Sequence, residues 1–285
     1  MTGTSLEVLS FMVSGIKKRS GSEYSDGRPG RINYHSEDEY RTVKLTVQST
    51  AYDMQDVAHL RDAINELFDG EITLREMRIK SVEVEYESPG QRTGELQLKA
   101  PEYVNGKQIK VAMVNSLEID DTTLVSTFTV EFETTELPYF ETKYTTLELH
   151  DRGYSATVEK YGLVDNIDDE KVKYRFTENN FTVYNAGNVT VEPESMVLNI
   201  NVNAVQSDKN FTIRNKTTGE EIVLKRASAG SHFRIQGMVI SLGSITNIFR
   251  DTNRRFISLA PGDNQFEILN GTFGEIRFEF KYLYK

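Results

Sequence analysis

The residues that could carry out catalysis or bind a metal are few and widely separated in this sequence. Cysteine is absent, which excludes thiol catalysis, disulfide bonds and thiolate metal sites. The histidines share no ligand spacing such as H-x-x-x-H; they are His35, His59, His150 and His232. No G-x-S-x-G motif supports a hydrolase serine. We therefore expect no metal site, no cofactor and no catalytic residues.

Paired carboxylates are the one kind of catalytic group that the sequence offers in number. A glycoside hydrolase needs two of them, one on each side of the sugar bond that it cleaves. The groups are Asp120 with Asp121, then Asp165, Asp168 and Asp169, then Glu192 with Glu194. In a chain with a formal net charge of −10, most such groups belong to solvated surfaces. A carboxylate-dependent hydrolase stays an alternative, and it requires turnover that substitution of one Asp or Glu abolishes.

Two other short motifs have ordinary structural explanations. Gly27-Arg28-Pro29-Gly30 is glycine-rich, but it lacks the Lys-Ser or Lys-Thr of a phosphate-binding loop, so we interpret it as a tight turn. The longest basic run is Lys17-Lys18-Arg19, and an acidic chain repels phosphate backbones. Specific nucleic-acid binding is therefore not expected, although DNA could pass such a surface without being retained.

The 285 residues are enough for two ordinary domains. The first five residues lack the basic and apolar regions of a signal peptide, and nowhere do 18 apolar residues follow one another. We expect a soluble chain that is made in the cytoplasm and does not associate with a membrane.

Strict alternation of apolar and polar residues recurs along most of the chain. Examples are Val43, Leu45 and Val47, then Phe128, Val130 and Phe132, then Ile276, Phe278, Phe280 and Tyr282. A period of two with β-branched and aromatic residues predicts strands with one buried and one solvated face, in mainly antiparallel sheets. The fold class is therefore mainly β.

One segment reads clearly as a helix. Apolar residues recur at three- and four-residue spacing over 54–68, Asp53 precedes them as a candidate N-cap, and Gly70 follows as a candidate C-terminal stop. A single helix among strands predicts an α+β N-terminal domain.

The pattern over 77–99 predicts a long β-hairpin with its tip at Ser88-Pro89-Gly90. A lone hairpin is marginal in water, so its apolar face should pack on something, either the core of its own domain or a neighbouring subunit. The candidate oligomer-interface residues are Val82, Val84, Tyr86, Leu96 and Leu98.

A domain boundary is expected between Leu137 and Gly153, where the polar stretch Glu141–Thr146 reads as a linker crossed by few contacts. We place the N-terminal domain at 1–145 and the C-terminal domain at 146–285. Turn signals recur frequently in the second half and no helical pattern interrupts it, which predicts a β-sandwich.

Several segments, in this order and spacing, resemble siphophage distal tail proteins (Dit). In the first half they are Asp26-Gly27-Arg28-Pro29-Gly30-Arg31-Ile32, the strand Arg41–Val47, the helix Asp56–Phe68 with Leu60-Arg61-Asp62, and Leu74-Arg75-Glu76-Met77-Arg78. In the second half they are Phe181–Gly187, Val191-Glu192-Pro193-Glu194, Phe211–Glu220 and Phe256–Asn264. Each is a modest signal alone, and their order across most of the chain makes the case.

The resemblance implies an N-terminal belt domain that forms a ring, in that family a hexamer, and a galectin-like C-terminal β-sandwich. It implies a structural hub at the distal tail tip, or baseplate, of the virion, and no enzymatic activity. The implied partners are other copies of the chain, the tail tube protein, the tail-associated protein and, in many relatives, receptor-binding proteins. The hairpin over 77–99 would then be the inter-subunit arm of the belt.

The sequence also departs from sugar-binding sandwiches. Galectins hold sugars with a tryptophan and an H-x-N-x-R strand, whereas this chain has no Trp and His232-Phe233-Arg234 does not reproduce the motif. A scaffold role for the sandwich is therefore expected. A cell-wall carbohydrate-binding module stays the alternative function, based on the sandwich and on the aromatic residues Tyr154, Tyr161, Tyr174 and Tyr184.

Overall fold

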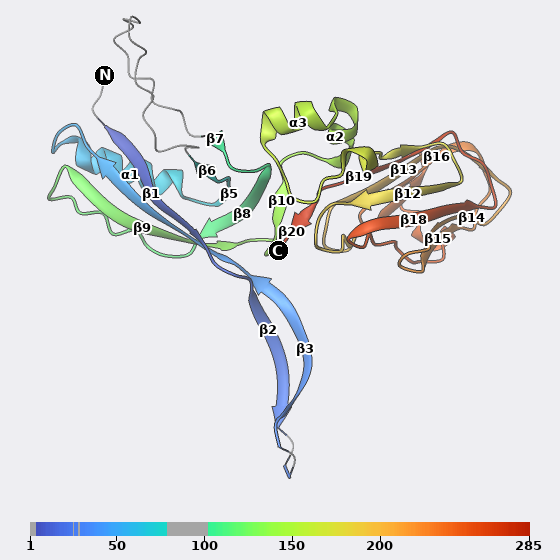
Figure 1. Ribbon diagram of the computed structural model, residues 1–285, viewed down its shortest axis with the longest axis horizontal. Coiled ribbons are helices and arrows are strands. Elements are labelled where there is room, and N and C mark those ends of the chain that lie inside the picture. Colours follow the sequence, from blue (N-terminus) through green and yellow to red (C-terminus); the bar gives the residue numbers. More distant parts are fainter. Residues whose placement is uncertain (1–3, 25, 28, 79–101) are drawn as a thin grey trace, which may run out of the picture. The chain divides into compact units, whose positions relative to one another are not determined.

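The computed structural model describes residues 4–24, 26–27, 29–78 and 102–285, and the chain divides into two compact units (Figure 1). Unit 1 contains Met1–Glu76, Gln108–Phe140 and Lys285, and unit 2 contains Met77–Lys107 and Glu141–Tyr284. This division differs from the expected boundaries chiefly because Met77–Lys107 groups with the C-terminal unit.

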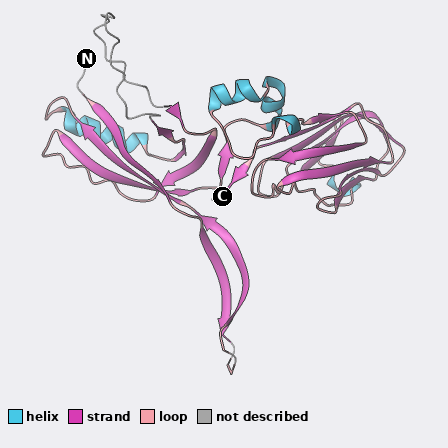
Figure 2. Cartoon of the chain, viewed as in Figure 1, coloured by secondary structure: helices cyan, strands magenta, loops and turns pink. Residues whose placement is uncertain are grey.

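Unit 1 is built on an antiparallel sheet with strand order β1-β4-β9-β8, and β5 pairs with β8. The strands are β1 (Ser5–Val13), β4 (Thr42–Thr50), β9 (Val125–Thr134), β8 (Lys107–Met113) and β5 (Glu71–Leu74). The predicted alternation is confirmed, because Val43, Leu45 and Val47 are buried while the residues between them are not. Mainly β structure is therefore confirmed, and strands dominate the chain in Figure 2.

Helix α1 (Asp56–Leu67) covers one face of this sheet. Its Ile64 and the following Phe68 are buried against β4 and β9, and the Phe68 ring meets Phe132 edge-on at 5.8 Å. The helix ends where expected, since Gly70 has φ +76°, a backbone conformation that glycine adopts without strain. Its start is fixed by Asp53, whose Oδ1 accepts hydrogen bonds from the amides of Gln55 and Asp56 at 2.9 and 3.0 Å.

We expect Asp53→Ala to lower the free energy of unfolding by about 1 kcal/mol, because two amides at the helix start lose their acceptor. A denaturant titration followed by circular dichroism measures this. Asp69→Ala is the control, since its side chain has no such role at the other end of α1 and its loss should change stability by less than about 0.5 kcal/mol. Equal losses of stability in both variants would show that Asp53 does not cap α1.

A second feature of unit 1 is an arm made of β2 (Lys17–Tyr24) and β3 (Arg31–Tyr40). The two strands pair with each other and with no other described strand. The turn between them contains Gly27 and Gly30 at φ +78° and +90°, in agreement with the tight-turn interpretation. The sequence did not indicate this arm, because strands without a buried face have no apolar alternation.

Unit 2 contains two antiparallel sheets, ordered β11-β19-β13-β16-β17 and β12-β18-β14-β15. The first has β11 (Arg175–Phe176), β19 (Glu275–Phe280), β13 (Leu198–Ser207), β16 (Ser228–Gln236) and β17 (Val239–Leu242). The second has β12 (Asn180–Asn185), β18 (Gly262–Leu269), β14 (Phe211–Asn215) and β15 (Glu220–Leu224).

The two sheets pack face to face through aromatic rings. Phe266 of β18 lies 4.9 Å from Phe278 of β19, and Phe211 of β14 lies 6.4 Å from Phe233 of β16, measured between ring centroids. All four side chains are at most 1% exposed. Unit 2 is therefore a β-sandwich with an aromatic core.

The expectation of an uninterrupted strand series in the second half is wrong, because α2 (Thr146–Arg152) and α3 (Tyr154–Tyr161) precede the sandwich. Thr145 caps α2 by accepting a hydrogen bond from the Glu148 amide. Gly153, at φ +83°, separates the helices. Each helix is too short for its apolar spacing to be read from the sequence.

The polar stretch Glu141–Thr146 is also not the exposed linker that we expected. Thr142, Tyr144 and Thr146 are at most 1% exposed. Thr142 lies in β10 (Phe140–Thr142), where its amide donates to the Tyr282 carbonyl, and Thr146 donates to the Phe278 carbonyl. The remaining short elements are β6 (Met77–Arg78), β7 (Glu102–Tyr103), β20 (Leu283–Tyr284) and the 3₁₀ turns η1 (Asp169–Lys171) and η2 (Phe249–Asp251).

Candidate interaction surfaces

Three of the carboxylates that could have served catalysis have structural partners. Asp121 pairs with Arg61 at 3.3 Å, Asp165 forms an ion pair with Lys107, and Asp168 accepts a hydrogen bond from the Glu170 amide at the start of η1. Within the described ranges, no group of three His, Asp or Glu side chains is arranged to hold a metal ion. No helix of the described chain is long and apolar enough to cross a membrane.

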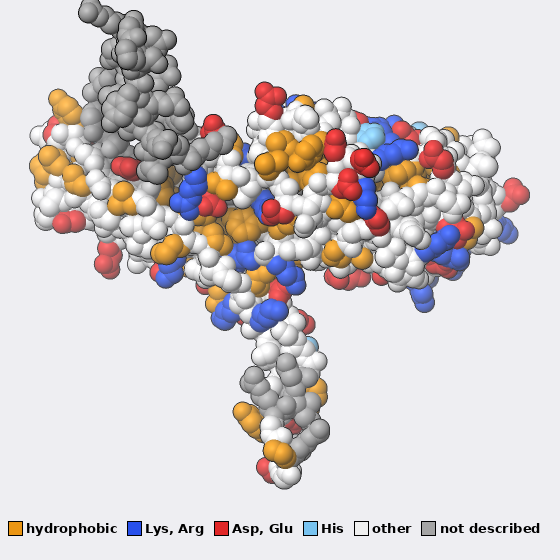
Figure 3. Space-filling view, viewed as in Figure 1, with side chains coloured by type: hydrophobic (Ala, Val, Ile, Leu, Met, Phe, Trp, Pro, Cys, Tyr) orange, Lys and Arg blue, Asp and Glu red, His pale blue; other side chains and the backbone are white. Residues whose placement is uncertain are grey.

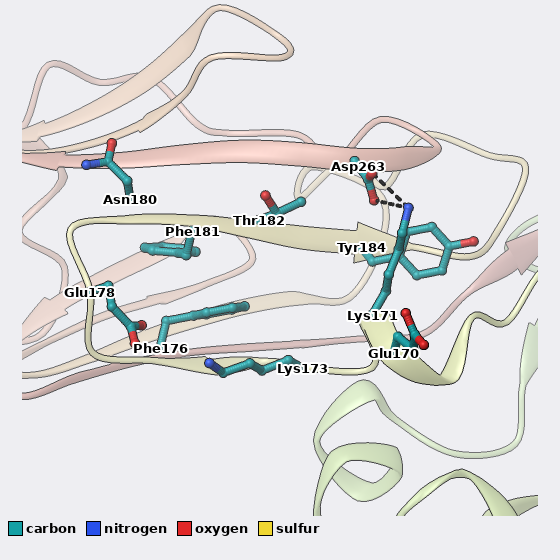
Figure 4. Close-up of a pocket in the computed structure, with 10 residues that line it drawn as sticks. All are labelled: Glu170, Lys171, Lys173, Phe176, Glu178, Asn180, Phe181, Thr182, Tyr184 and Asp263. Carbon is teal, nitrogen blue, oxygen red and sulfur yellow. Dashed lines mark hydrogen bonds and ion pairs between the residues drawn. The ribbon is translucent and has the colours of Figure 1, made fainter.

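One hollow of about 440 Å³ lies on the sandwich beside β12 (Figure 4). Lys171 crosses it and donates to both carboxylate oxygens of Asp263, at 2.9 and 3.1 Å. Figure 4 shows Glu170 and Glu178 at opposite ends of the hollow. The arrangement therefore lacks the two facing carboxylates that glycoside hydrolysis requires.

The tyrosines that motivated the carbohydrate alternative form no exposed platform. Tyr174 is 0% exposed and donates to the Tyr184 carbonyl, and burial raises the pKa of its hydroxyl. Tyr184 donates in turn to the Asn166 carbonyl, and Tyr161 donates to Glu148. Because sugars stack on open aromatic faces, the buried ring of Tyr174 offers no sugar platform, and Tyr154, Tyr161 and Tyr184 are only partly exposed.

The five predicted interface residues, Val82, Val84, Tyr86, Leu96 and Leu98, lie outside the described residues. The neighbouring strands β6 and β7 are described and pair antiparallel, with Met77 opposite Tyr103. Beside them, a hollow of about 500 Å³ is lined by side chains of β7, of α3 and of the residues that follow each of them. Val104 follows β7 and Leu163 follows α3, and they are 46% and 57% exposed.

One open surface of unit 1 is the edge strand β1. It pairs with β4 on one side and with no described strand on the other. Soluble proteins protect such edges with Lys, Pro or short strands, because free backbone groups attract further strands. Over its nine residues, β1 has only Glu7 as a charged side chain, and a bulge between Val8 and Ser10 is its one interruption.

The side chains of β1 are apolar and exposed on the face that should be buried. The register places Val8 beside Val47 and Val13 beside Val43, on the face that α1 covers. Val43 and Val47 are 0% exposed, whereas Val8 is 55% and Val13 is 36% exposed. The core of unit 1 therefore continues onto β1 but is uncovered there, which is typical of a protein-protein interface.

A second stretch of open edge lies on β9. This strand pairs with β8 only from Phe132 to Thr134, and the Asn115 side chain bonds the Thr129 carbonyl and the Glu131 amide. Its first residues, Val125–Phe128, have β4 as their one described strand neighbour. The sheet thus has two different open edges, which suits a head-to-tail contact between copies.

Comparison with solved structures identifies the fold. The chain is similar to the Dit protein of phage SPP1, a hub of the adsorption apparatus in phages that infect Gram-positive bacteria, with a TM-score of 0.62 and 9% identity over 97% of this chain and 93% of that one. The resemblance to distal tail proteins is therefore confirmed at the level of the fold. Two phage P2 baseplate structures, with Ca and with Sr, match at TM-scores of 0.39, 11% and 12% identity, and cover 97% of this chain and 90% of theirs.

No protein-family profile and no curated protein sequence matches the chain. The fold shared at 9% identity is established by comparing the structures.

Proposed function

We propose that this chain is a structural, non-enzymatic subunit of a siphophage tail tip, where copies of it form a ring. The observation that carries this proposal is the open sheet of unit 1, with an uncovered apolar edge at β1 and a different open edge at β9. The fold shared with the SPP1 hub protein supports the same role. Six copies is the number that we propose, from the resemblance to the distal tail family.

The proposed ring joins the tail tube protein to the tail-associated protein and the host-adhesion apparatus at the distal end of the virion. Unit 2, a sandwich with a buried aromatic core and no exposed aromatic platform among the positions predicted for one, serves as a galectin-like scaffold. Its outer surface is the proposed docking site for receptor-binding proteins. Synthesis takes place in the host cytoplasm before assembly.

DNA passage through the ring is compatible with the face of the unit 1 sheet that α1 does not cover. Along β4 and β9 this face carries Thr, Gln and Glu side chains, and its one lysine there, Lys44, pairs with Glu131. A wall without unpaired cations would let a phosphate backbone pass without retaining it. We propose that this face lines the channel.

The direct test is the mass of the purified protein. We expect native mass spectrometry and light scattering to give a ring several times heavier than the 32.5 kDa chain, with six copies as the expected number. We expect the ring to persist at micromolar concentrations. A chain that stays monomeric at 100 µM, with and without its tail tube partner, would contradict the proposal.

A further inference from the structure

One charged side chain in unit 1 is buried without an ion pair to any residue that the structure describes. Arg41, at the junction of β3 and β4, is 6% exposed. Its backbone is fixed, since its amide donates to the Thr134 hydroxyl and its carbonyl accepts from the Thr134 amide, each at 3.1 Å. The guanidinium lies over the Phe140 ring at 5.1 Å.

The guanidinium of Arg41 forms no ion pair with any described residue, and its Nε is buried without a hydrogen-bond partner. Burial lowers the pKa of Arg41, and the field of Asp38 opposes this effect only in part. Removing an arginine from water without a partner is unfavourable by several kcal/mol. We therefore expect the buried guanidinium of Arg41 to have a function.

The nearby carboxylate at the root of the arm is already occupied. Asp38 pairs with Lys285 at 2.9 Å and Lys18 at 3.7 Å, and it accepts a hydrogen bond from Tyr139. The hydrogen bond from Lys285 contributes most to lowering the pKa of Asp38. Figure 3 shows Lys and Arg side chains gathered around this root, and the guanidinium of Arg41 adds a further cation there.

The opposite end of the same strands is acidic. β4 spans nine residues, about 30 Å at the rise of an extended strand, from the root of the arm to Thr50. At that far end the Ala51 amide donates to the Leu124 carbonyl, which ties the loop before β9 to the sheet. Exposed carboxylates gather around it: Asp53, Glu118, Asp120 and Asp121. Arg61 forms ion pairs there with Asp62 and Asp121.

We propose that Arg41 binds a carboxylate from a second copy of this chain, donated by the acidic end of the neighbour's unit 1 sheet. The two ends of one sheet are complementary in charge, and a contact between unlike ends is the head-to-tail kind that closes a ring. The main chain of Arg41 is fixed by its hydrogen bonds to Thr134 and its guanidinium lies against the Phe140 ring, which positions this side chain for a carboxylate. This inference rests on the proposed ring and names one of its contacts.

Arg41→Met tests the proposal, because methionine fills a similar volume, packs on Phe140 and carries no charge. Replacing buried ionic groups by apolar residues of similar volume is often neutral or stabilising, because the cost of removing charge from water disappears. We therefore expect the melting temperature of the dissociated chain to stay within about 2 °C of wild type or to rise. We expect self-association in sedimentation velocity to weaken at least about tenfold, as loss of a charge-assisted hydrogen bond predicts.

Arg255→Met is the matched control, since Arg255 is an exposed arginine of unit 2 and its loss should change neither quantity. If the wild-type protein forms a ring and the Arg41→Met ring dissociates to the same extent, the inference is wrong. A fall of more than about 5 °C in the melting temperature would assign Arg41 a purely internal role, with the same consequence.

Adding an acetylated pentaglutamate peptide tests the carboxylate site of Arg41 separately from the proposed ring. At matched ionic strength, the peptide should raise the melting temperature of the wild-type chain and leave that of Arg41→Met unchanged. A wild-type chain that never associates contradicts the proposed ring, whatever the peptide does. A ring that forms while the peptide has equal effects on both proteins contradicts only the carboxylate site.

Discussion

A lysine at position 8 is expected to convert the assembled protein to monomers without unfolding it. Val8 is 55% exposed in the single chain, so a longer polar side chain is accommodated there, and lysine is a common protective residue of edge strands. In the proposed ring the same position is covered, and a buried ammonium without a partner is unfavourable by several kcal/mol. Val8→Lys should therefore weaken assembly at least about 100-fold, which native mass spectrometry at micromolar concentration detects.

The control for this variant is Val197→Lys, which introduces the same charge at a valine of unit 2 that is 60% exposed. We expect it to keep the wild-type mass. Thermal melting of both variants at low concentration should agree with wild type within about 2 °C, which separates loss of assembly from loss of folding. If Val8→Lys forms the same ring as wild type, β1 is not the interface and the open edge has another use.

The sequence predicts those parts of the fold in which burial leaves a periodic trace. Val43, Leu45 and Val47 alternate because one face of β4 packs under α1, and α1 itself is readable from Ile64 and its apolar neighbours. The mainly β class and the likeness to distal tail proteins follow from such segments. The likeness was visible in sequence through ordered short motifs, while at 9% identity only the structure shows that the fold is shared.

Elements without a periodic apolar pattern cannot be predicted from the sequence in this way. The β2-β3 arm has no buried face, so its strands look like loops in the sequence. Thr142 and Thr146 look like linker residues because they are polar, yet their hydroxyls take part in hydrogen bonds with the backbone of Tyr282, Phe278 and Phe280. The sequence does not distinguish a buried threonine that hydrogen-bonds at a strand edge from an exposed one, and only the packing does.

The candidate interface inferred from the sequence, residues 82–98, differs from the one inferred from the structure, β1, for a related reason. The one-sided apolar pattern of residues 82–98 suggested a surface that needs a partner, and that prediction stays untested because it lies outside the described residues. β1 carries a run of apolar residues, Leu6, Val8, Leu9, Met12 and Val13, that gives no hint of exposure in the sequence. The structure shows it to be an edge, because the exposed fractions of these side chains lie between 36% and 55%.

The second large effect concerns where unit 2 begins. We expect a fragment starting at Glu141 to melt cooperatively, and a fragment starting at Thr146 to melt about 10 °C lower or not to fold. The shorter fragment lacks Thr142, which forms a backbone and a side-chain hydrogen bond with Tyr282, and it lacks Tyr144, which is 1% exposed and lies 5.8 Å from the Tyr161 ring. These losses amount to about 3–5 kcal/mol, and each kcal/mol shifts a domain of this size by about 2–4 °C.

Thr142→Val in the longer fragment tests the cause of this difference, because it keeps the shape of the side chain and removes its hydroxyl. The hydroxyl accepts from the Tyr282 amide and donates to the Tyr144 carbonyl, so the variant should account for part of the loss, about 1–3 kcal/mol. Differential scanning calorimetry of the three proteins gives the comparison. Equal melting temperatures for both fragments would show that Glu141–Thr146 acts as a linker after all. An unfolded longer fragment would show that unit 2 also needs Met77–Lys107, since the Gly106 amide in that segment donates to the Leu163 carbonyl.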